Sequence, residues 1–302
     1  MRSQIYEKIV FMNASGNQVI IVDKSINNRW EMIGRTGFTA PEVELITETY
    51  ANGVTKTLQR IVSPRTCTIT ILAIGKTPEQ LDTEFGEMIS ILMDITKGIE
   101  GKLYITRPDG SVLYLNCVYS GGANVKEEYR LFRRFTLSFY ASDPYFYRDI
   151  DDVFIDIPPK ARLTLRNRLM LGTGHVLGEN MGRGEQLVIN NGQETIQPII
   201  RVNSLKGTLA IWNDANGDRI VFNEVVIGRE KTLVIDTRDI NKTIYIEDSD
   251  GSMSPAGQYL NWSNIEFDFA LIPGENSIKF QTEDLSASKG LTLQLSERYL
   301  SA

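Results

Sequence analysis

The dominant feature of the sequence is the alternation of apolar and polar residues, which recurs along most of the 302-residue chain. Residues 66–73 show it clearly, because Cys67, Ile69 and Ile71 alternate with threonines. A period of two places successive side chains on opposite faces of a β-strand. Turn-forming pairs such as Asn52-Gly53, which favours tight hairpins, separate these segments. The sequence therefore predicts a mainly β protein.

One segment departs from this alternation and has the spacing of a helix. Its apolar residues recur three or four positions apart: Leu81, Phe85, Met88, Leu92 and Ile95. Thr77 is a suitable N-cap, Pro78 fits the first helical position, and Gln80 completes a capping box. Gly98 is a suitable stop signal. We therefore expect one helix, over residues 78–96.

A break in the pattern near the middle of the chain indicates two domains. Asp143-Pro144 ends a long predicted strand, because the residue before a proline avoids the helical region and proline cannot continue a strand ladder. We expect a first domain over residues 1–150 with strands and the helix, and a second over residues 151–302 with strands only. Short strands, residues 266–271 among them, recur there at the spacing typical of a β-sandwich.

Charge and composition exclude several classes of protein. The formal net charge is −6, which argues against a nucleic-acid-binding domain, because such a domain needs a basic footprint. Arg130, Arg133 and Arg134 beside Phe132 are therefore interpreted as a charged strand face, as are the basic residues of 160–168. The chain has no run of about 18 apolar residues, so we expect no membrane span, and we see no signal peptide.

The sequence offers few groups for catalysis or metal binding. Its two cysteines, Cys67 and Cys117, lie in alternating segments and are expected to be unpaired core residues, as in a reducing compartment, with a disulfide between them as the alternative. The one histidine, His175, lies in residues 172–184, a glycine-rich segment expected to form a loop. Residues 214–218 lack the glycine position and final glutamate of a calcium loop and are interpreted as a hairpin turn. We therefore expect no catalytic residue, no metal site and no cofactor.

Four short motifs, each combining turn and strand residues, follow one another along the chain: Asp143-Pro144-Tyr145-Phe146-Tyr147, Pro198-Ile199-Ile200, Ile235-Asp236-Thr237, and Pro273-Gly274-Glu275-Asn276 with Phe280. The aromatic residues after Pro144 can fold back as a hydrophobic plug between the domains. Asn276 can stabilise the turn at Pro273-Gly274 by side-chain bonds to the backbone. In this order and spacing, the motifs resemble those of the distal tail proteins of long-tailed (siphovirus-type) bacteriophages, the phage tail component family.

The resemblance implies an N-terminal domain like that of tail-tube proteins, a β-sandwich or split barrel with one helix, and a galectin-like C-terminal β-sandwich. It implies a structural protein and not an enzyme, which forms a hexameric ring at the tail tip and joins the tail tube to the tail-associated hub protein. The outer domain carries receptor-binding or other baseplate proteins in some members. DNA passes through such a ring during ejection without stable binding. The protein would be made in the host bacterial cytoplasm and assembled into the virion.

Two other functions remain open from the sequence. Aromatic residues on a sandwich can stack on sugar rings, although they equally fill cores with a polar tip near the edge. A carbohydrate-binding module that recognises the bacterial surface is therefore the alternative, with three candidate stacking residues: Trp212, Tyr259 and Trp262. A cell-wall hydrolase is the third hypothesis, although no pair of the 38 acidic residues is selected by its spacing.

Overall fold

The structure is a computed structural model that describes residues 7–23, 30–93, 100–155, 163–165, 175–177, 182–203, 205–228, 230–239, 241–261, 268–282 and 290–302. The chain forms two compact units. The first comprises Met1–Arg148 together with Arg298–Ala302, and the second comprises Asp149–Glu297. The chain therefore passes from one unit to the other twice. The described residues form mainly strands and one α-helix, so the predicted fold class is confirmed.

The first unit is built on one large antiparallel sheet. Its elements are β1 (Lys8–Met12), β2 (Gln18–Asp23), β3 (Trp30–Thr36), β4 (Val43–Thr49), β5 (Thr55–Val62), β6 (Arg65–Ile74), α1 (Pro78–Leu92), β7 (Gly101–Thr106), β8 (Val112–Tyr129) and β9 (Phe132–Ala141). Seven strands pair in the order β2-β1-β7-β8-β9-β6-β3. Two further strands, β10 (Phe146–Asp149) and β23 (Ser296–Tyr299), pair with each other, and β10 also pairs with β8.

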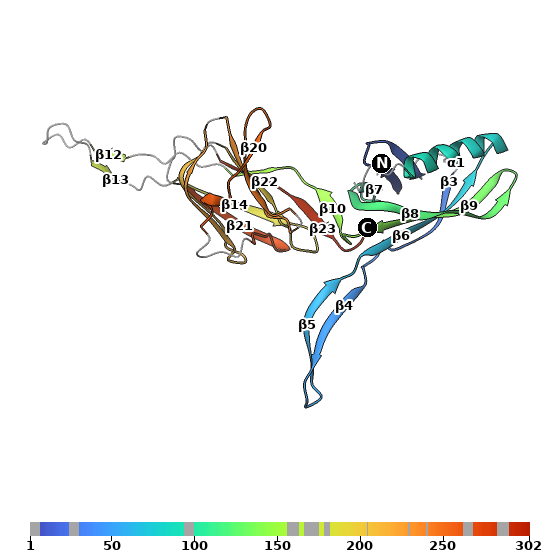
Figure 1. Ribbon diagram of the computed structural model, residues 1–302, viewed down its shortest axis with the longest axis horizontal. Coiled ribbons are helices and arrows are strands. Elements are labelled where there is room, and N and C mark those ends of the chain that lie inside the picture. Colours follow the sequence, from blue (N-terminus) through green and yellow to red (C-terminus); the bar gives the residue numbers. More distant parts are fainter. Residues whose placement is uncertain are drawn as a thin grey trace. The chain divides into compact units, whose positions relative to one another are not determined.

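The alternation in β6 decides which face of this sheet is buried. Cys67, Ile69 and Ile71 are fully buried, whereas the threonines between them lie on the opposite face. Helix α1 covers the buried face, as Figure 1 shows, and contributes Leu81 and Met88 to the same core. Strand β6 is therefore apolar towards the helix and carries threonine hydroxyls along the middle of its other side.

The start of α1 follows the prediction only in part. Thr77 is the N-cap, and its side chain accepts a hydrogen bond from the Gln80 backbone N–H at 3.2 Å. The Gln80 side chain donates to Glu84 instead of completing the capping box. The described helix ends at Leu92, and the predicted residues Ile95 and Gly98 lie outside the described residues.

Strand β8 extends from Val112 to Tyr129, because two glycines, Gly121 and Gly122, let the strand bulge and continue. Its register with β9 shifts at three places between Tyr119 and Glu127. Gly122 has a positive φ of 99°, and a Cβ on it would lie 2.2 Å from the Thr136 carbonyl oxygen. Only glycine allows this close approach. The two glycines therefore allow one strand to continue through the bulges.

Strands β4 and β5 form a separate two-stranded hairpin, which extends away from the rest of the first unit (Figure 1). Its tip contains Asn52-Gly53, the pair that predicted a hairpin turn. Every residue of β4 is exposed, and β5 is exposed up to Ile61. The hairpin therefore buries almost nothing within the chain.

The second unit is a β-sandwich. Its elements are β11 (Val153–Ile155), β12 (Leu163–Leu165), β13 (His175–Leu177), β14 (Gly182–Asn190), β15 (Ile199–Asn203), β16 (Lys206–Asn213), β17 (Arg219–Val226), β18 (Thr232–Asp236), β19 (Thr243–Glu247), β20 (Met253–Pro255), the short 3-10 helix η1 (Gly257–Tyr259), β21 (Gly274–Thr282) and β22 (Leu291–Gln294). One sheet has the order β11-β22-β15-β18-β19-β20, the other β14-β21-β16-β17. Both sheets supply residues to one core, such as Leu233 and Phe280.

Two local predictions for the second unit are wrong. The segment 266–271 does not form a strand in its described part, because Leu271 makes only an isolated bridge to Ile196 while Phe269 and Leu271 are buried. The glycine-rich segment 172–184 contains β13 and the first residues of β14, so the described part is paired backbone and not loop. Glycine content therefore misled the prediction, because the partner strands, β12 for β13 and β21 for β14, decide the pairing.

Candidate functional site

The junction motif forms a tight turn between β9 and β10. Asp143 accepts a hydrogen bond from the Tyr145 backbone N–H at 3.2 Å, and the Tyr147 hydroxyl donates to its other carboxylate oxygen. Pro144 between them is buried. Burial raises the pKa of the Tyr147 hydroxyl, so this group remains a donor at neutral pH. The motif residues thus hold each other in place.

Phe146 belongs to the core of the first unit. Its side chain is fully buried and stacks on Phe38, with ring centroids 6.2 Å apart. The guanidinium of Arg65 lies over the same ring, 4.6 Å from its centroid. Phe146, one of the aromatic residues predicted to form a hydrophobic plug, is therefore part of the core of the first unit.

Tyr145 and Tyr147 extend the motif towards other aromatic and basic side chains. Tyr147 stacks on Tyr114 at 5.7 Å. Arg298, which comes from β23, lies over the rings of Tyr145 and Tyr147 at 5.5 and 5.7 Å. The sequence does not predict this contact, because Arg298 is about half the chain away from the motif.

The end of the chain closes this part of the first unit. Arg65 is 5% exposed and donates to the carbonyl oxygens of Gly37, Thr39 and Leu300 at 3.2, 3.2 and 2.9 Å. Burial lowers the pKa of Arg65 below its ordinary value. The backbone N–H of Ala302 donates to the Phe38 carbonyl at 3.0 Å. Residues 37–39 and the segment at Leu300, which are far apart in the sequence, therefore meet at the buried side chain of Arg65.

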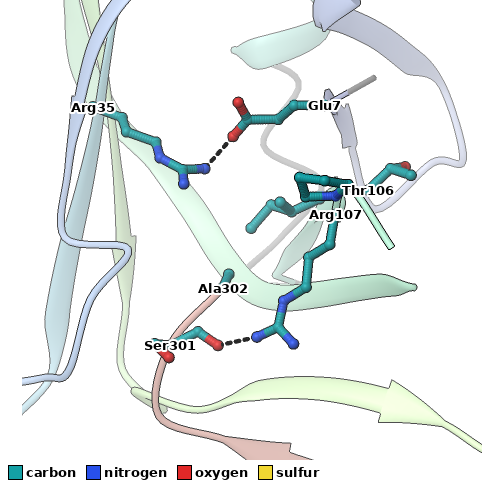
Figure 2. A pocket seen from close by; sticks show the side chains of 8 residues that line it. Glu7, Arg35, Thr106, Arg107, Ser301 and Ala302 are labelled. Atoms are coloured by element: carbon teal, nitrogen blue, oxygen red, sulfur yellow. Dashed lines mark hydrogen bonds and ion pairs between the residues drawn. The ribbon is translucent and has the colours of Figure 1, made fainter. Parts of the chain in front are cut away.

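A cavity of about 310 Å³ lies beside this C-terminal segment. Figure 2 shows Arg107 donating to the Ser301 carbonyl, and Arg35 paired with Glu7 on the other side of the cavity. Both arginines already have partners from the protein. Among the described residues that line the cavity, the one carboxylate, Glu7, is paired with Arg35, and we assign no reaction to this cavity.

The motif residues of the second unit fix loops at the ends of its strands. The Thr237 hydroxyl and backbone N–H both donate to the carbonyl of buried Pro198, at 2.7 and 3.3 Å. Asp236 is nearly buried and accepts two hydrogen bonds from the Arg238 guanidinium, at 2.9 and 2.6 Å. These contacts tie the end of β18 to the start of β15.

Asn276 has the role that the sequence predicts for it. Its side chain donates to the carbonyls of Ile272 and Gly274 and accepts from the Ile272 N–H, at 2.8 to 3.0 Å. It also accepts from the side chain of Asn213, which is buried like Asn276 itself. The buried side chain of Asn276 thus stabilises the Pro273-Gly274 turn by hydrogen bonds to its backbone. Phe280, four residues further, is fully buried in the sandwich core.

The structure does not bring the candidate stacking residues together. Trp212 is half-buried and faces away from the core, because Leu209 and Ile211 on the same strand face inward. Its cross-strand neighbours are Arg219 and Lys279. Tyr259 packs against the sandwich core. Trp262 lies outside the described residues.

The chemistry available in the described part of the chain is limited. It contains no group of three or more His, Cys, Asp or Glu side chains that could hold a metal ion. Burial raises the pKa of Cys67 to about 11 and also raises the pKa of Cys117, which makes both thiols poor nucleophiles at neutral pH. None of the described helices is long and apolar enough to cross a membrane. Arg133, one of the arginines interpreted as a charged strand face, pairs with Asp82 and lies over the ring of Phe85.

Comparison with known proteins connects this fold to phage tails. No family model and no curated protein sequence matches the chain. Among solved structures, the Dit protein of phage SPP1 matches 97% of this chain and 99% of its own, with a TM-score of 0.61 and 15% identity. The chain has the fold of a phage distal tail protein. The resemblance carried by the four sequence motifs is confirmed at the level of the fold.

Two further matches come from the baseplate of phage P2 in its activated conformation, one with calcium and one with strontium. Each has a TM-score of 0.50 and 11% identity, and covers 97% of this chain and 98% of the other. The SPP1 protein is presented as a paradigm of the hub adsorption apparatus of phages that infect Gram-positive bacteria. The similarity in all three cases spans both units of the chain.

Proposed function

We propose that this chain is a structural component of a phage tail tip, where six copies form a ring that joins the tail tube to the hub and baseplate proteins. One observation carries the proposal: a single alignment to the SPP1 hub protein covers nearly the whole of both chains, so both units match together and in order. The protein would be made in the cytoplasm of the host bacterium and assembled into the virion. Its work would be to present complementary surfaces, without bond chemistry.

The hairpin β4–β5 supports the assembly of copies into a ring. An isolated two-stranded hairpin is at best marginally stable in water. This one nevertheless exposes apolar side chains along its length, with Leu45 and Leu58 at 56 and 55% exposure. A closed ring needs one surface of each subunit to meet a different surface of the next. A projecting arm with apolar side chains suits one half of such a contact.

The face of the first sheet opposite α1 supports a role as the wall of a DNA passage. Its middle carries hydroxyl groups in cross-strand pairs, Thr36 with Thr68 at 2.6 Å and Thr70 with Thr136 at 3.1 Å. Proteins hold DNA mainly through Lys and Arg at its phosphates. The same face also carries two basic residues, Arg134 on β9 and Lys102 on β7. The net charge of the chain is nevertheless −6, and the polyanion would pass without stable binding.

The second unit, as a self-contained sandwich, suits the outer position that the resemblance implies for it. There it could carry receptor-binding or other baseplate proteins. Carbohydrate binding is the second candidate function, favoured by the outward position of Trp212 between Arg219 and Lys279, where a sugar ring could stack and receive hydrogen bonds. Glycan-array binding that is lost in Trp212→Ala and kept in Tyr259→Ala would favour it.

The ring is tested on full-length protein mixed with its tail partners and imaged by negative stain. The double variant Leu45→Glu/Leu58→Glu places charges on the hairpin, where the side chains support no core. Its matched control is Leu187→Glu/Ile189→Glu on β14 of the second unit, where exposure is similar, 51 and 49%. We expect rings from the control and none from the hairpin variant. If the hairpin variant also formed rings, the proposed role of the arm would be contradicted.

A further inference from the structure

The tripeptide Ala-Asn-Gly occurs twice in the chain, at residues 51–53 and at residues 215–217. The first copy lies at the tip of the hairpin β4–β5, the projecting arm in Figure 1, and the second connects β16 to β17 in the sandwich. Gly53 and Gly217 have φ values of 80° and 81°. In both turns the asparagine carbonyl oxygen accepts a hydrogen bond at 3.1 Å from the backbone N–H two residues further on. The same tripeptide therefore occupies two similar turns.

The two turns differ in the contacts of the asparagine side-chain NH2 group. In Asn216 this group donates to Asp218 at 2.7 Å and to the carbonyl oxygen of Ala270 at 3.0 Å. Asp218 also accepts a hydrogen bond from the Ala270 backbone N–H at 2.9 Å, which binds this turn to a neighbouring segment. Among the residues that the structure describes, the NH2 group of Asn52 has no acceptor. The side chain of Asn52 is therefore held only by its own turn.

The two turns also differ in how much structure must open to expose their backbone. Strands β4 and β5 pair only with each other, and residues 50–54 at the tip are all exposed. Strands β16 and β17 instead place Ile211 and Ile220 in the core of the sandwich. An isolated two-stranded hairpin is at best marginally stable in water, whereas core strands open only at a free energy close to that of global unfolding. The tip of the arm therefore opens far more often than the turn in the sandwich.

We propose that Asn52 is a site of spontaneous deamidation, and that the fold confines this reaction to the arm. The backbone nitrogen of Gly53 loses its proton and attacks the side-chain carbonyl carbon of Asn52. The bond from that carbon to the NH2 group breaks, ammonia leaves with the added proton, and a five-membered succinimide forms. Water then opens the ring at either carbonyl and gives aspartate or isoaspartate, with no further reactant.

The geometry of the closed turn explains why opening controls the rate. The Gly53 N–H donates to the Tyr50 carbonyl oxygen at 2.8 Å, and this hydrogen bond must break before the nitrogen can attack. Glycine assists the attack, because it has no side chain beside the attacking nitrogen. In the sandwich, the Gly217 N–H is held in the same way by Asn213 at 2.9 Å, and the contacts of Asn216 must break as well. Asn216 is therefore the slower site.

The two products have different effects on the arm. Aspartate leaves the main chain unchanged, and two other turns of the chain already carry it at the equivalent position. There Asp109 and Asp250 accept hydrogen bonds from the backbone N–H two residues further on, at 2.9 and 2.8 Å, as Asn52 does. Isoaspartate adds a methylene group to the main chain. This displaces the two hydrogen bonds that join Tyr50 to Gly53 and Val54, so the tip of the arm opens.

The reaction belongs to the single chain and does not depend on the proposed ring. If the arm contacts the next subunit, chains that deamidate before assembly would lose the tip of that contact while the sandwich stays intact. This consequence rests on the proposed function, whereas the difference in rate between Asn52 and Asn216 does not.

Incubation of the full-length protein at mildly alkaline pH, in water enriched in oxygen-18, tests the site, because each deamidated residue gains a labelled oxygen. Peptide mass spectrometry then gives the rates at Asn52, Asn216 and Asn191, the third asparagine that precedes a glycine. The side chain of Asn191 donates to buried Glu297. We expect Asn52 to react at least about tenfold faster than either of the others in the folded protein.

The same measurement in concentrated urea is the control for sequence. Because the tripeptide is the same, the rates at Asn52 and Asn216 are expected to agree there within about twofold. A rate at Asn216 that equals the rate at Asn52 in the folded protein would overturn the proposal. A tenfold difference that persists in urea would overturn it too, since the flanking residues and not the fold would then cause it.

The variant Asn52→Asp separates the effect of the added charge from that of the added methylene group. Hydrogen exchange of residues 43–62 is compared in fresh protein, in deamidated protein and in freshly prepared Asn52→Asp. We expect exchange at the tip to rise about fivefold in the isoaspartate fraction, the effect of losing one ordinary hydrogen bond, and to stay unchanged in the variant. Unchanged exchange in the isoaspartate fraction, or an equal rise in Asn52→Asp, would contradict the proposed opening of the arm.

Discussion

Truncation of Phe146 tests the core position of the junction motif. We expect Phe146→Ala to destabilise the first unit far more than Trp212→Ala destabilises the second. Phe146 is fully buried between Phe38 and Arg65, whereas Trp212 is half-buried and faces outward. The comparison therefore contrasts two large aromatic residues that differ in burial.

The magnitude follows from the contacts that disappear. Truncating a buried phenylalanine costs about 3–5 kcal/mol, through lost burial and the cavity left behind. The Phe38 stack and the Arg65 guanidinium also lose their partner ring, which places the expected loss near the upper part of that range. For a unit of this size, a loss of about 4 kcal/mol lowers Tm by roughly 8–16 °C. Trp212→Ala, which exposes less new surface, is expected to cost about 2 kcal/mol or less.

Differential scanning calorimetry of the full chain is the assay, with the transitions of the two units followed separately because multidomain proteins need not unfold in two states. Phe146→Leu is the control, because it keeps most of the volume and removes only the ring; it is expected to lose about 1–1.5 kcal/mol. The reasoning would be refuted if Phe146→Ala lowered Tm no more than Trp212→Ala, or if it acted on the transition of the second unit.

Three further predictions concern the second unit, the thiols and catalysis. Asn276→Ala leaves the Ile272 N–H and the Asn213 side chain without their acceptor, so urea unfolding of the second unit is expected to show a loss of about 2–3 kcal/mol, with the first unit unchanged. Burial raises the pKa of Cys67 from 9.0 to about 11, so the folded state keeps a proton that the unfolded state releases. The Cys67 contribution is complete below pH 9 and is lost as pH rises through 11. Urea unfolding at pH 11 should therefore show the first unit losing roughly 2 kcal/mol less in Cys67→Ala than in the unchanged chain, while Cys117, whose pKa burial also raises, adds to the decline in both. Peptidoglycan or polysaccharide incubated with the protein is expected to release no product; release abolished by one Asp or Glu substitution would contradict this.

Local signals in the sequence predicted the elements that short-range physics decides. Thr77 and Pro78 start α1, and alternation assigns Cys67, Ile69 and Ile71 to the buried face of β6. The turn bonding of Asn276 was predictable for the same reason, because its partners lie within four residues. Such contacts depend on residue type and spacing alone.

Contacts between distant segments could not be predicted in this way. Arg65 and Leu300 are 235 positions apart, and no periodicity connects them. Alternation assigned Trp212 to one face of its strand but gave no means of deciding which face is buried, so its separation from Tyr259 emerged only with the sandwich. The bulges of β8 at Gly121 and Gly122 could not be predicted for the same reason, because a bulge depends on the partner strand.

The two crossings between the units have a consequence for how such chains diversify. The second unit is inserted into the chain of the first, between Arg148 and Arg298, and the strands that lead out and back, β10 and β23, pair with each other. An insert whose two ends start side by side places little demand on the shape of what lies between them. The sandwich is therefore an exchangeable cassette: another module with adjacent termini could replace it while the host sheet, its helix and its arm remain intact.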